Sequence, residues 1–405
     1  MNFLFAWRYF KSKKSTNAIN IIAWISVTAI TVGTAALIIV LSVFNGFEDL
    51  VKSLYADFYA DIRVAPASGK TMLLNEGRIK QLQSIQGVAA LSLIAEEKAV
   101  LTNGENQSIV FLKGVDAAYT HTNKITQHII RGNFDVGTAD QPKLIVGAGI
   151  ENAVGIDIDK SLYPTTLYVP NRNASNLASL DALNAYSLKA SGTFMVQQDF
   201  DNKYVFSNLG FVKYMLNMLP NEYSSVEIKT VNAGQADEVK KRINHLLGPH
   251  FIVETRYEQN KSLFTVMNVE RWVIYVILSL ILVVAAFNMI GALTMLILEK
   301  QKDIAVLKAL GADNGFIQKI FVSEGFVLAG IGGIAGIALA SLVCWLQLKF
   351  KFIKLAGGTF IIDYYPVQLH VADFILVTST VLIIAAFASW IPARKAGLQH
   401  VVLKS

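Results

Sequence analysis

The stretch INIIAWISVTAITVGTAALIIVLSVF, residues 19–44, contains no charged side chain. A helix needs about 20 apolar residues to cross the roughly 30 Å of hydrocarbon in a bilayer. Three more uncharged segments meet this requirement, at Trp272–Leu298, Gly325–Leu348 and Phe374–Ala393. The chain is therefore predicted to be an α-helical membrane protein with four transmembrane helices.

The first two apolar segments are longer than a bilayer requires. The first is also too long for the apolar run of a signal peptide, and no cleavage site with small residues follows it. No Pro-rich or Gly-rich linker separates either segment from the polar sequence between them. We expect both helices to continue beyond the membrane into that polar region. In the third segment, Gly332 and Gly336 form a small-xxx-small pair that predicts close helix packing.

The polar region between the first two spans is large enough for one or two domains with real cores. Residues 47–270 contain 21 basic and 24 acidic residues, and the rest of the chain contains 15 basic and 6 acidic residues. The overall charge of +6 therefore belongs to the membrane part, and it does not indicate nucleic-acid binding. The single cysteine, Cys344, lies in the third span, so no disulfide stabilises the inserted region.

Two stretches of the inserted region follow one β-α-β plan. In the first, the strand ADIRVAP precedes a helix that places Ile79, Leu82 and Ile85 on one face. In the second, SSVEIKTV precedes a helix that aligns Val239, Ile243 and Leu246 and stops at Gly248. We expect an α+β domain with the two units side by side, and a second, β-rich lobe between them.

These patterns predict a full set of boundaries. In chain order they are an interfacial N-terminal helix over 1–18, the first span over 19–47, a periplasmic domain over 48–270 (β-α-β lobe at about 55–115 and 211–265, β-rich insert at about 116–210), the second span over 271–298, a cytoplasmic segment over 299–315, the third span over 316–348, an external loop over 349–373, the fourth span over 374–393 and a tail over 394–405.

Basic residues near the span ends predict the orientation, because cytoplasmic segments carry an excess of Lys and Arg. With four spans, the N-terminus, the link between spans two and three and the C-terminus lie on one side. These segments carry Arg8, Lys11, Lys13, Lys14, Lys300, Lys302, Lys308, Lys319, Arg394, Lys395 and Lys404. We therefore expect both termini in the cytoplasm. The external loop carries Lys349, Lys351 and Lys354, which weakens the bias without reversing it.

Motifs for catalysis are sparse. VAPASGKT, residues 64–71, resembles a P-loop, but Val64 stands where the motif needs its first glycine. The six histidines show no metal-ligand spacing, and no GxSxG occurs. We expect no catalytic residue, no metal site and no cofactor in this chain, and no nucleic acid among its partners.

The link between spans two and three contains a short amphipathic helix. Ile304, Leu307 and Leu310 form an apolar strip, and Gly311 ends the helix. On physical grounds alone, it is either a solvated helix at the membrane edge or a docking element for a cytoplasmic partner. Inside the second span, Asn288 either bonds to another helix or lines a cavity.

Several stretches carry a family resemblance over nearly the whole chain. They are AWRYFKSKK (6–14), AALIIVLSVFNGFE (35–48), LILVVAAFNMIGALTMLILEKQKDIAVLKALGA (280–312), SEGFVLAGIGGIAGIALA (323–340) and IPARKAG (391–397). In them the chain resembles the transmembrane subunits of the bacterial lipoprotein-releasing ABC transporter, of LolC/LolE type. These belong to a permease group that also contains the macrolide exporter and the cell-division permease FtsX.

The resemblance implies an inner-membrane permease that works as a dimer, with a second copy or a relative, on a separate cytoplasmic ATPase dimer that binds ATP and Mg²⁺. It also implies lipoprotein substrates, a periplasmic carrier and three groups of site residues. The coupling residues are Glu299, Lys300, Lys302, Asp303, Ile304, Leu307, Lys308 and Gly311, with Ile304 and Leu307 as the main contact. The acyl-chain cavity is lined by Val40, Phe44, Val276, Leu280 and Asn288. The carrier-binding hairpin falls in Val169–Leu188, with Pro170, Asn171, Leu177 and Leu180.

Other functions in the same group stay open. One alternative is an FtsX-like permease that transmits ATPase motion to a cell-wall hydrolase. Another is an efflux permease of the macrolide-exporter type. The absence of a P-loop in the sequence argues against an exporter fused to its own ATPase, and the size of the inserted region argues against FtsX, whose external domain is much smaller.

Overall fold

The computed structural model describes residues 17–158, 165–172, 183–355 and 364–398. The chain forms two compact units. The membrane unit consists of Met1–Leu50, Thr265–Leu355 and Tyr364–Ser405, and the inserted unit consists of Val51–Phe264 and Ala356–Asp363. Both units have their own apolar core, so each is described separately below.

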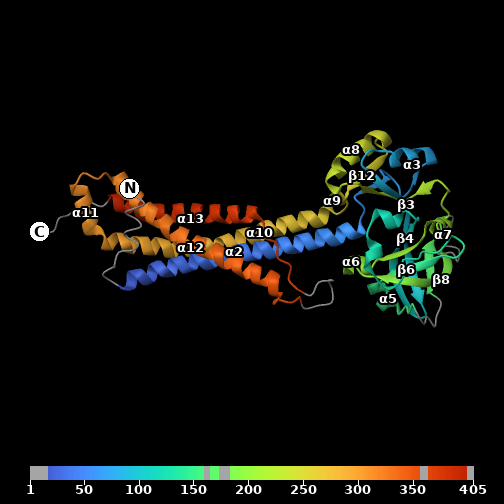
Figure 1. The fold of residues 1–405 in the computed structure, drawn as a ribbon, viewed down its shortest axis with the longest axis horizontal. Helices are drawn as coiled ribbons and strands as arrows, with labels where there is room; N and C mark the ends of the chain where they lie inside the picture. Colours follow the sequence, from blue (N-terminus) through green and yellow to red (C-terminus); the bar gives the residue numbers. More distant parts are fainter. Residues whose placement is uncertain (1–16, 159–164, 173–182, 356–363, 399–405) are drawn as a thin grey trace. The chain divides into compact units, whose positions relative to one another are not determined.

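Four helices of the described chain are long and apolar enough to cross a membrane (Figure 1). They are α2 (Asn17–Phe58), α10 (Lys261–Glu299), α12 (Asn314–Phe350) and α13 (Val371–Leu398). The predicted four-span architecture with an α+β domain between the first two spans is confirmed. As expected from their length, α2 and α10 continue well past the ends of their apolar segments, into the sequence of the inserted unit.

Glycine allows α12 to pack closely on α2. A Cβ added to Gly332 would lie 2.9 Å from the Cβ of Ile30, and one added to Gly336 would lie 2.7 Å from the carbonyl oxygen of Thr31. Any larger residue at these positions would push the helices apart. The small-xxx-small pair therefore acts as predicted, and the core of the unit forms around this contact.

The first half of the inserted unit is a four-stranded antiparallel sheet in the order β12-β1-β11-β3. The strands are β1 (Ile62–Pro66), β3 (Val88–Asn103), β11 (Ser225–Thr230) and β12 (Phe251–Thr255). The β-α-β units β1-α3-β3 and β11-α8-β12 are both present, but they interleave: β11 lies between β1 and β3, and β1 lies between β11 and β12. The expected side-by-side arrangement is therefore wrong, because each unit completes its sheet with a strand of the other.

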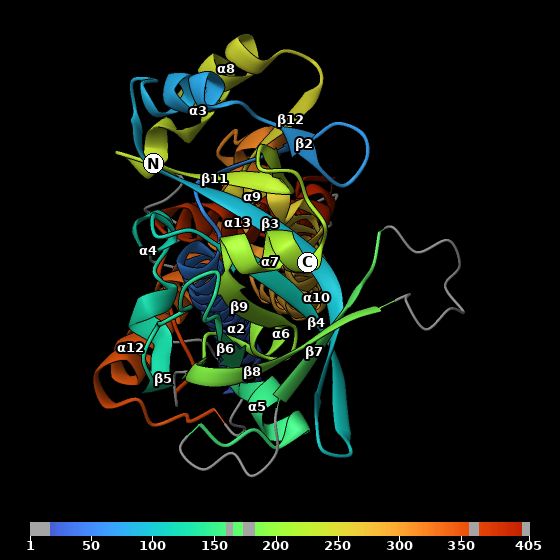
Figure 2. The ribbon, with the colours of Figure 1, turned by 90° about the vertical axis from the view of Figure 1, so that its right-hand side faces the viewer.

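Two helices cover this half of the sheet, α3 (Glu76–Gln83) and α8 (Ala236–Leu247), which lie next to each other in Figures 1 and 2. Leu82 of α3 and Val239 and Ile243 of α8 are buried against the strands, as predicted. The third buried residue of α8 is Leu247, and the predicted Leu246 is 37% exposed. The predicted face was off by one residue at the last turn.

The second half closes on itself. The pairing path runs β3-β4-β9-β6-β8-β7 and returns from β7 to β3. The strands are β4 (Asn106–Val115), β6 (Lys143–Gly147), β7 (Thr165–Pro170), β8 (Leu183–Phe194) and β9 (Tyr204–Asn208), with β5 (Ile129–Gly132) on the edge beside β8. The insert is β-rich as predicted, but it is no separate lobe, because the long strand β3 belongs to both halves.

A buried ion pair spans the two halves of the sheet. Lys113 of β4 lies 2.6 Å from Glu227 of β11, with 2% and 5% of the side chains exposed. The Lys113 ammonium also lies over the ring of Tyr119, 5.0 Å from its centre.

The remaining short elements are β2 (Met72–Leu73), β10 (Glu222–Tyr223), α4 (Tyr119–Thr122), η1 (Ile125–His128), α5 (Ala148–Val154), α6 (Gln198–Asp201), α7 (Leu209–Met215), η3 (Ala233–Gln235), α9 (Arg256–Gln259) and α11 (Gln301–Ala309).

Candidate functional site

The link between α10 and α12 folds as the short helix α11, Gln301–Ala309. Gly311 ends this segment in a left-handed conformation, with φ of +93°. Asp313 then caps α12, since its Oδ1 accepts a hydrogen bond from the backbone N–H of Phe316 at 3.0 Å. A separate helix therefore occupies the predicted coupling segment.

Ile304 faces the interior of this chain. It is only 4% exposed and packs in a cluster with Ile297 of α10, Ile317 and Phe321 of α12, and Ala396 of α13. A side chain that is already buried within its own chain offers no surface to a partner. The prediction that Ile304 makes the main contact with an ATPase is therefore wrong, because this residue of the apolar strip packs against α10, α12 and α13.

The exposed face of α11 presents Val306, which lies outside the predicted strip, together with Leu310, which belongs to it. Val306 is 60% exposed and Leu310, just after the helix, is 80% exposed. Being four residues apart, they lie on one face. Of the predicted coupling residues, Lys302, Asp303 and Gly311 are exposed, Leu307 and Lys308 are half-buried, and Lys308 donates a hydrogen bond to the carbonyl oxygen of Gly397 at 2.9 Å. Glu299 and Lys300 are also half-buried, and Lys300 lies 3.3 Å from Asp303.

The predicted cavity residues divide between two helices. Val276 and Leu280 of α10 are more than half exposed in the single chain, whereas Val40 and Phe44 of α2 are half-buried. Asn288 of α10 is exposed, and it forms no hydrogen bond with any residue that the structure describes. Of the two readings of Asn288, an interhelical bond within the chain is therefore excluded for the described part, and a place on an open face of α10 remains.

A polar latch joins three helices at the end of the membrane unit where α2 leaves its apolar segment. Asp373 of α13 has 2% of its side chain exposed. Arg271 of α10 donates to its Oδ1 at 2.6 Å, and Asn45 of α2 donates to its Oδ2 at 2.5 Å. Next to it, Gly46 packs on the backbone of Pro366 so closely that an added Cβ would lie 2.4 Å from the carbonyl oxygen. We call Asp373, Arg271 and Asn45 the outer latch.

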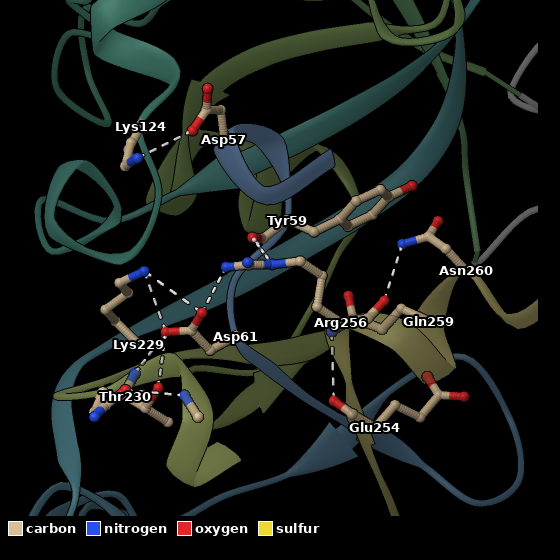
Figure 3. Close-up of polar contacts among 12 residues, drawn as sticks. Asp57, Tyr59, Asp61, Lys124, Lys229, Thr230, Glu254, Arg256, Gln259 and Asn260 are labelled. Atoms are coloured by element: carbon tan, nitrogen blue, oxygen red, sulfur yellow. Dashed lines mark hydrogen bonds and ion pairs between the residues drawn. The ribbon is translucent and has the colours of Figure 1, made fainter. Parts of the chain in front are cut away.

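A second polar cluster, centred on Asp61, lies in the inserted unit (Figure 3). Arg256 points its guanidinium at Asp61, with Nη2 2.5 Å from Oδ1, and Lys229 approaches Oδ2 at 3.2 Å. The backbone N–H and the hydroxyl of Thr230 both donate to Oδ2, at 2.9 and 3.0 Å. Only 2% of the Asp61 side chain is exposed, and burial lowers the pKa of Arg256 despite the attraction of the carboxylate.

This Asp61 cluster fixes the strands that adjoin the two long helices in sequence. Asp61 directly precedes β1 and follows the end of α2, and Arg256 follows β12 and begins α9, just before α10. Arg256 also donates from its Nε to the carbonyl oxygen of Tyr59 at 3.2 Å. The last turn of α2 is held as well, because Asp57 pairs with Lys124 at 3.3 Å and with His128 at 3.1 Å. The two chain entries into the inserted unit are thus bound to one another.

The predicted carrier-binding segment is a β-hairpin. β7 and β8 pair in antiparallel register from Thr165–Leu188 to Pro170–Leu183. Just beyond the last paired residues, Arg172 lies 2.8 Å from Glu222, and Asn217 donates to Asn171 at 3.1 Å. Leu177 and Leu180 lie outside the described residues. The structure thus brings Pro170 and Asn171 to the end of a two-stranded arm.

Comparison with known protein families accounts for both units. The MacB-like periplasmic core domain family matches residues 23–246, which is more than half of the chain. The FtsX-like permease C-terminal family matches residues 275–399. This chain belongs to the family with the MacB-like periplasmic core domain. The inserted unit of the permease is accordingly a periplasmic domain, and the outer latch lies at the periplasmic end of the membrane unit.

Curated relatives match this permease over nearly its whole length. The lipoprotein-releasing system transmembrane protein LolE of Haemophilus influenzae is 25% identical over 97% of this chain and 96% of its own length. The protein named LolC in Neisseria meningitidis is 25% identical, with 96% of both chains covered. LolC of Xylella fastidiosa is 22% identical over 96% of this chain and 94% of its own. The resemblance to the LolC/LolE type is therefore confirmed.

The sequence analysis of the permease missed Val306, Asp61 and Asp373 as site residues. Val306 gave no signal because α11 is apolar on two faces, and periodicity alone does not choose between them. The signal for the latch was present in the form of opposite charges, Arg271 and Asp373, each directly before an apolar segment that enters the membrane from the same side. No local pattern indicated Asp61, because its donors come from residues far along the chain.

Proposed function

We propose that this permease is a subunit of an ABC transporter that extracts lipoproteins from the outer leaflet of the bacterial inner membrane and passes them to a periplasmic carrier. The near-full-length similarity to proteins named LolC and LolE carries the proposal. Four spans with a single large periplasmic domain between the first two agree with it. Energy comes from a separate cytoplasmic ATPase dimer, which binds ATP and Mg²⁺, and both termini of the permease lie in the cytoplasm.

Coupling to the ATPase occurs through the exposed face of α11. Val306 and Leu310 supply the apolar contact, and Lys302 and Asp303 surround it with charges. Ile304 transmits the force, because it is buried against α10, α12 and α13 on the other side of the same helix. A displacement of α11 therefore acts on three membrane helices together.

This coupling face can be tested by copurification. Burying a Val or Leu side chain contributes about 1.5–3 kcal/mol each, so V306D with L310D should reduce the copurified ATPase at least tenfold while membrane insertion persists. V231D is the matched control, since Val231 is an equally exposed apolar residue in the periplasmic domain. Normal copurification and ATP hydrolysis by the double variant would refute this coupling face.

Acyl chains enter at the outward halves of α2 and α10. Of the four spans, the apolar window of α10 is the least buried within the chain, at 22% against 50% for α2. Val276 and Leu280 lie on its exposed side, Val40 and Phe44 lie on α2, and Asn288 adds one polar group to the same helix as Leu280. An acyl anchor gains about 0.8 kcal/mol per buried CH₂ in any apolar site. Release therefore requires the work of ATP hydrolysis.

Photo-crosslinking can test the substrate. A crosslinker at Leu280 should capture lipoproteins without ATP and lose them when ATP is hydrolysed. The matched control is Ile334 of α12, which is 71% exposed but lies outside the proposed cavity. Capture of lipoproteins at both positions alike would remove the cavity assignment. Capture of only non-acylated molecules at Leu280 would favour the efflux alternative. If Leu280 captures no substrate and a cell-wall hydrolase associates with the permease, the FtsX-like alternative would be favoured.

The β7–β8 hairpin is the proposed contact for the periplasmic carrier, with Pro170, Asn171, Leu177 and Leu180 as its residues. The hairpin is held to the domain by the pair Arg172–Glu222, and β8 carries the exposed side chains Leu183 and Tyr186. A second permease, either a copy of this chain or a relative, covers the open face of α10. Replacement of residues 171–182 by a short Gly-Ser turn should abolish carrier binding and leave ATP hydrolysis unchanged.

A further inference from the structure

The periplasmic end of α12 carries an unusual exposed segment. All residues from Leu348 to Lys354 are exposed, and the run LKFKFIK alternates basic with large apolar side chains. Membrane proteins normally concentrate Lys and Arg on the cytoplasmic side. This end lies at the periplasmic side, because α13, which begins after the following loop, carries the latch residue Asp373. Neither the ATPase contact nor the proposed cavity explains three lysines here.

The segment is held in a defined shape. Gln347, which is 3% exposed, donates to the carbonyl oxygens of Ile353 and Tyr365, both at 3.1 Å, and accepts from the N–H of Ile353 at 3.0 Å. Lys351 ends α12 in the left-handed conformation, with φ of +49°. Glycine usually fills this position because a Cβ is disfavoured there. In the described chain only one other non-glycine residue has a positive φ, and it is an asparagine, a type that tolerates the conformation.

The three ammonium groups have no carboxylate partner among the described residues. Two of them lie over aromatic rings instead. The Nζ of Lys349 is 5.0 Å from the centre of the Trp345 ring, and that of Lys351 is 4.0 Å from the centre of the Tyr364 ring. A cation over a ring keeps its charge and its N–H donors. With respect to the part of the chain that the structure describes, these lysines are therefore available to an anion.

We propose that Lys349, Lys351 and Lys354 bind the phosphate of an anionic phospholipid headgroup in the outer leaflet. Trp345, Phe350 and Phe352 are each more than half exposed beside these charges. Exposed aromatic residues at the end of a span belong at the headgroup level of a bilayer. A phosphate there meets the ammonium groups while the acyl chains contact the rings. Charge complementarity and the adjoining apolar surface together favour a lipid over a free anion.

The site can be tested on the full-length permease by native mass spectrometry. The protein is purified with phosphatidylglycerol and phosphatidylcholine in equal amounts, and the retained lipids are counted. The variant K349Q/K351Q/K354Q should lose preference for phosphatidylglycerol by about fivefold for each lysine. The control variant K80Q/K189Q/K241Q removes three exposed lysines of the periplasmic domain and should retain the wild-type preference.

Two further arms make the outcome decisive. K351G relieves the left-handed strain, so it should melt at the same or a higher temperature and still lose about fivefold in phosphatidylglycerol retention. Millimolar inorganic phosphate should leave the bound lipid in place. Unchanged preference in the triple variant, an equal loss in the control variant, wild-type retention by K351G, or displacement of the lipid by free phosphate would each overturn the proposal.

Discussion

Asp61 in the periplasmic domain and Asp373 in the membrane unit are both buried and both bind one arginine, but their surroundings differ. Asp61 accepts from Arg256, Lys229 and both the backbone and the hydroxyl of Thr230. Asp373 accepts from two side chains, Arg271 and Asn45. The Asn45 Oδ1 atom is buried without a hydrogen-bond partner in the described chain. The carboxylate of Asp61 thus accepts from more donors than that of Asp373, and the partner Asn45 keeps one buried oxygen without a donor.

This difference indicates that the Asp61 cluster holds its strands rigidly, whereas the outer latch can open. Thr230 belongs to β11, so releasing Asp61 requires movement within a sheet. Releasing Asp373 requires only that two side chains rotate, and Arg271, which is 30% exposed, can then be hydrated. A buried pair with excellent geometry and additional donors resists separation, whereas a pair near water separates at lower cost. We infer that α2, α10 and α13 part at the latch while the entries into the periplasmic domain stay together.

The largest effect is expected at Asp61. Asp61→Asn keeps one acceptor for Thr230 but leaves the charges of Arg256 and Lys229 without a counter-charge, so the domain should lose about 3 kcal/mol of unfolding free energy. Urea unfolding of the isolated segment 51–264, which is one compact unit, measures this loss. Thr230→Val is the control and should cost about 1 kcal/mol for its one hydroxyl bond. Equal losses in both variants would contradict the role of the charges.

The second effect concerns the latch. Asp373→Asn should cost about 1–2 kcal/mol, because Arg271 regains water. The single cysteine supplies a probe: Cys344 is 1% exposed in α12. If the helices part when the latch is weakened, N-ethylmaleimide should label Cys344 about tenfold faster, which corresponds to about 1.4 kcal/mol.

A control for this experiment lies at the other end of the membrane unit. Asp303 is an exposed aspartate that pairs with Lys300 at 3.3 Å. Asp303→Asn should leave the labelling rate of Cys344 unchanged, because an exposed ion pair contributes little. Equal acceleration by both substitutions would show that labelling reports general loosening and not the latch.

The sequence predicted those parts of the fold that depend on local pattern. Uncharged runs identified the four spans, and apolar spacing identified α3 and α8 with Leu82, Val239 and Ile243 on their buried faces. It did not predict the interleaving of β1 with β11, because strand pairing over about 160 residues is set by the packing of the whole domain. The closed half of the sheet was missed for the same reason.

At the candidate site, too, the sequence predicted the local element but not which of its residues are buried. The position of α11 was predicted from its apolar strip and the terminating Gly311, but the burial of Ile304 and the exposure of Val306 were not, because both side chains are apolar. Only the three-dimensional structure shows that α10, α12 and α13 already cover Ile304. Asp61 and Asp373 were likewise unremarkable in sequence, since a buried carboxylate is recognised by its donors and not by its neighbours along the chain.

The smallest effect is expected at a third buried aspartate, which extends the comparison to a carboxylate that forms no ion pair with any described residue. Asp201 of α6 is 6% exposed, and its Oδ1 accepts from the backbone N–H of Val196 at 2.9 Å. Burial raises the pKa of Asp201 from 3.8 to about 6, although the backbone hydrogen bonds and the charge of His128 oppose the rise. A carboxyl group with a raised pKa in the fold stabilises it fully below pH 3.8 and loses that contribution as pH rises through 6.

Asp201→Asn should therefore remove the destabilisation that the buried, ionised carboxylate causes in the wild type at neutral pH. Direct conversion of the pKa difference gives about 3 kcal/mol, and solvent screening reduces the expected gain to about 1 kcal/mol. The gain should be present at pH 7.5 and vanish near pH 4, because the wild-type carboxyl is then protonated. Urea unfolding of segment 51–264 at both pH values measures the difference between variant and wild type, in which the other titrating groups cancel. A loss at pH 7.5 would mean that Asp201 is held as a carboxylate like Asp61, and a gain independent of pH would mean that ionisation of Asp201 is not its cause.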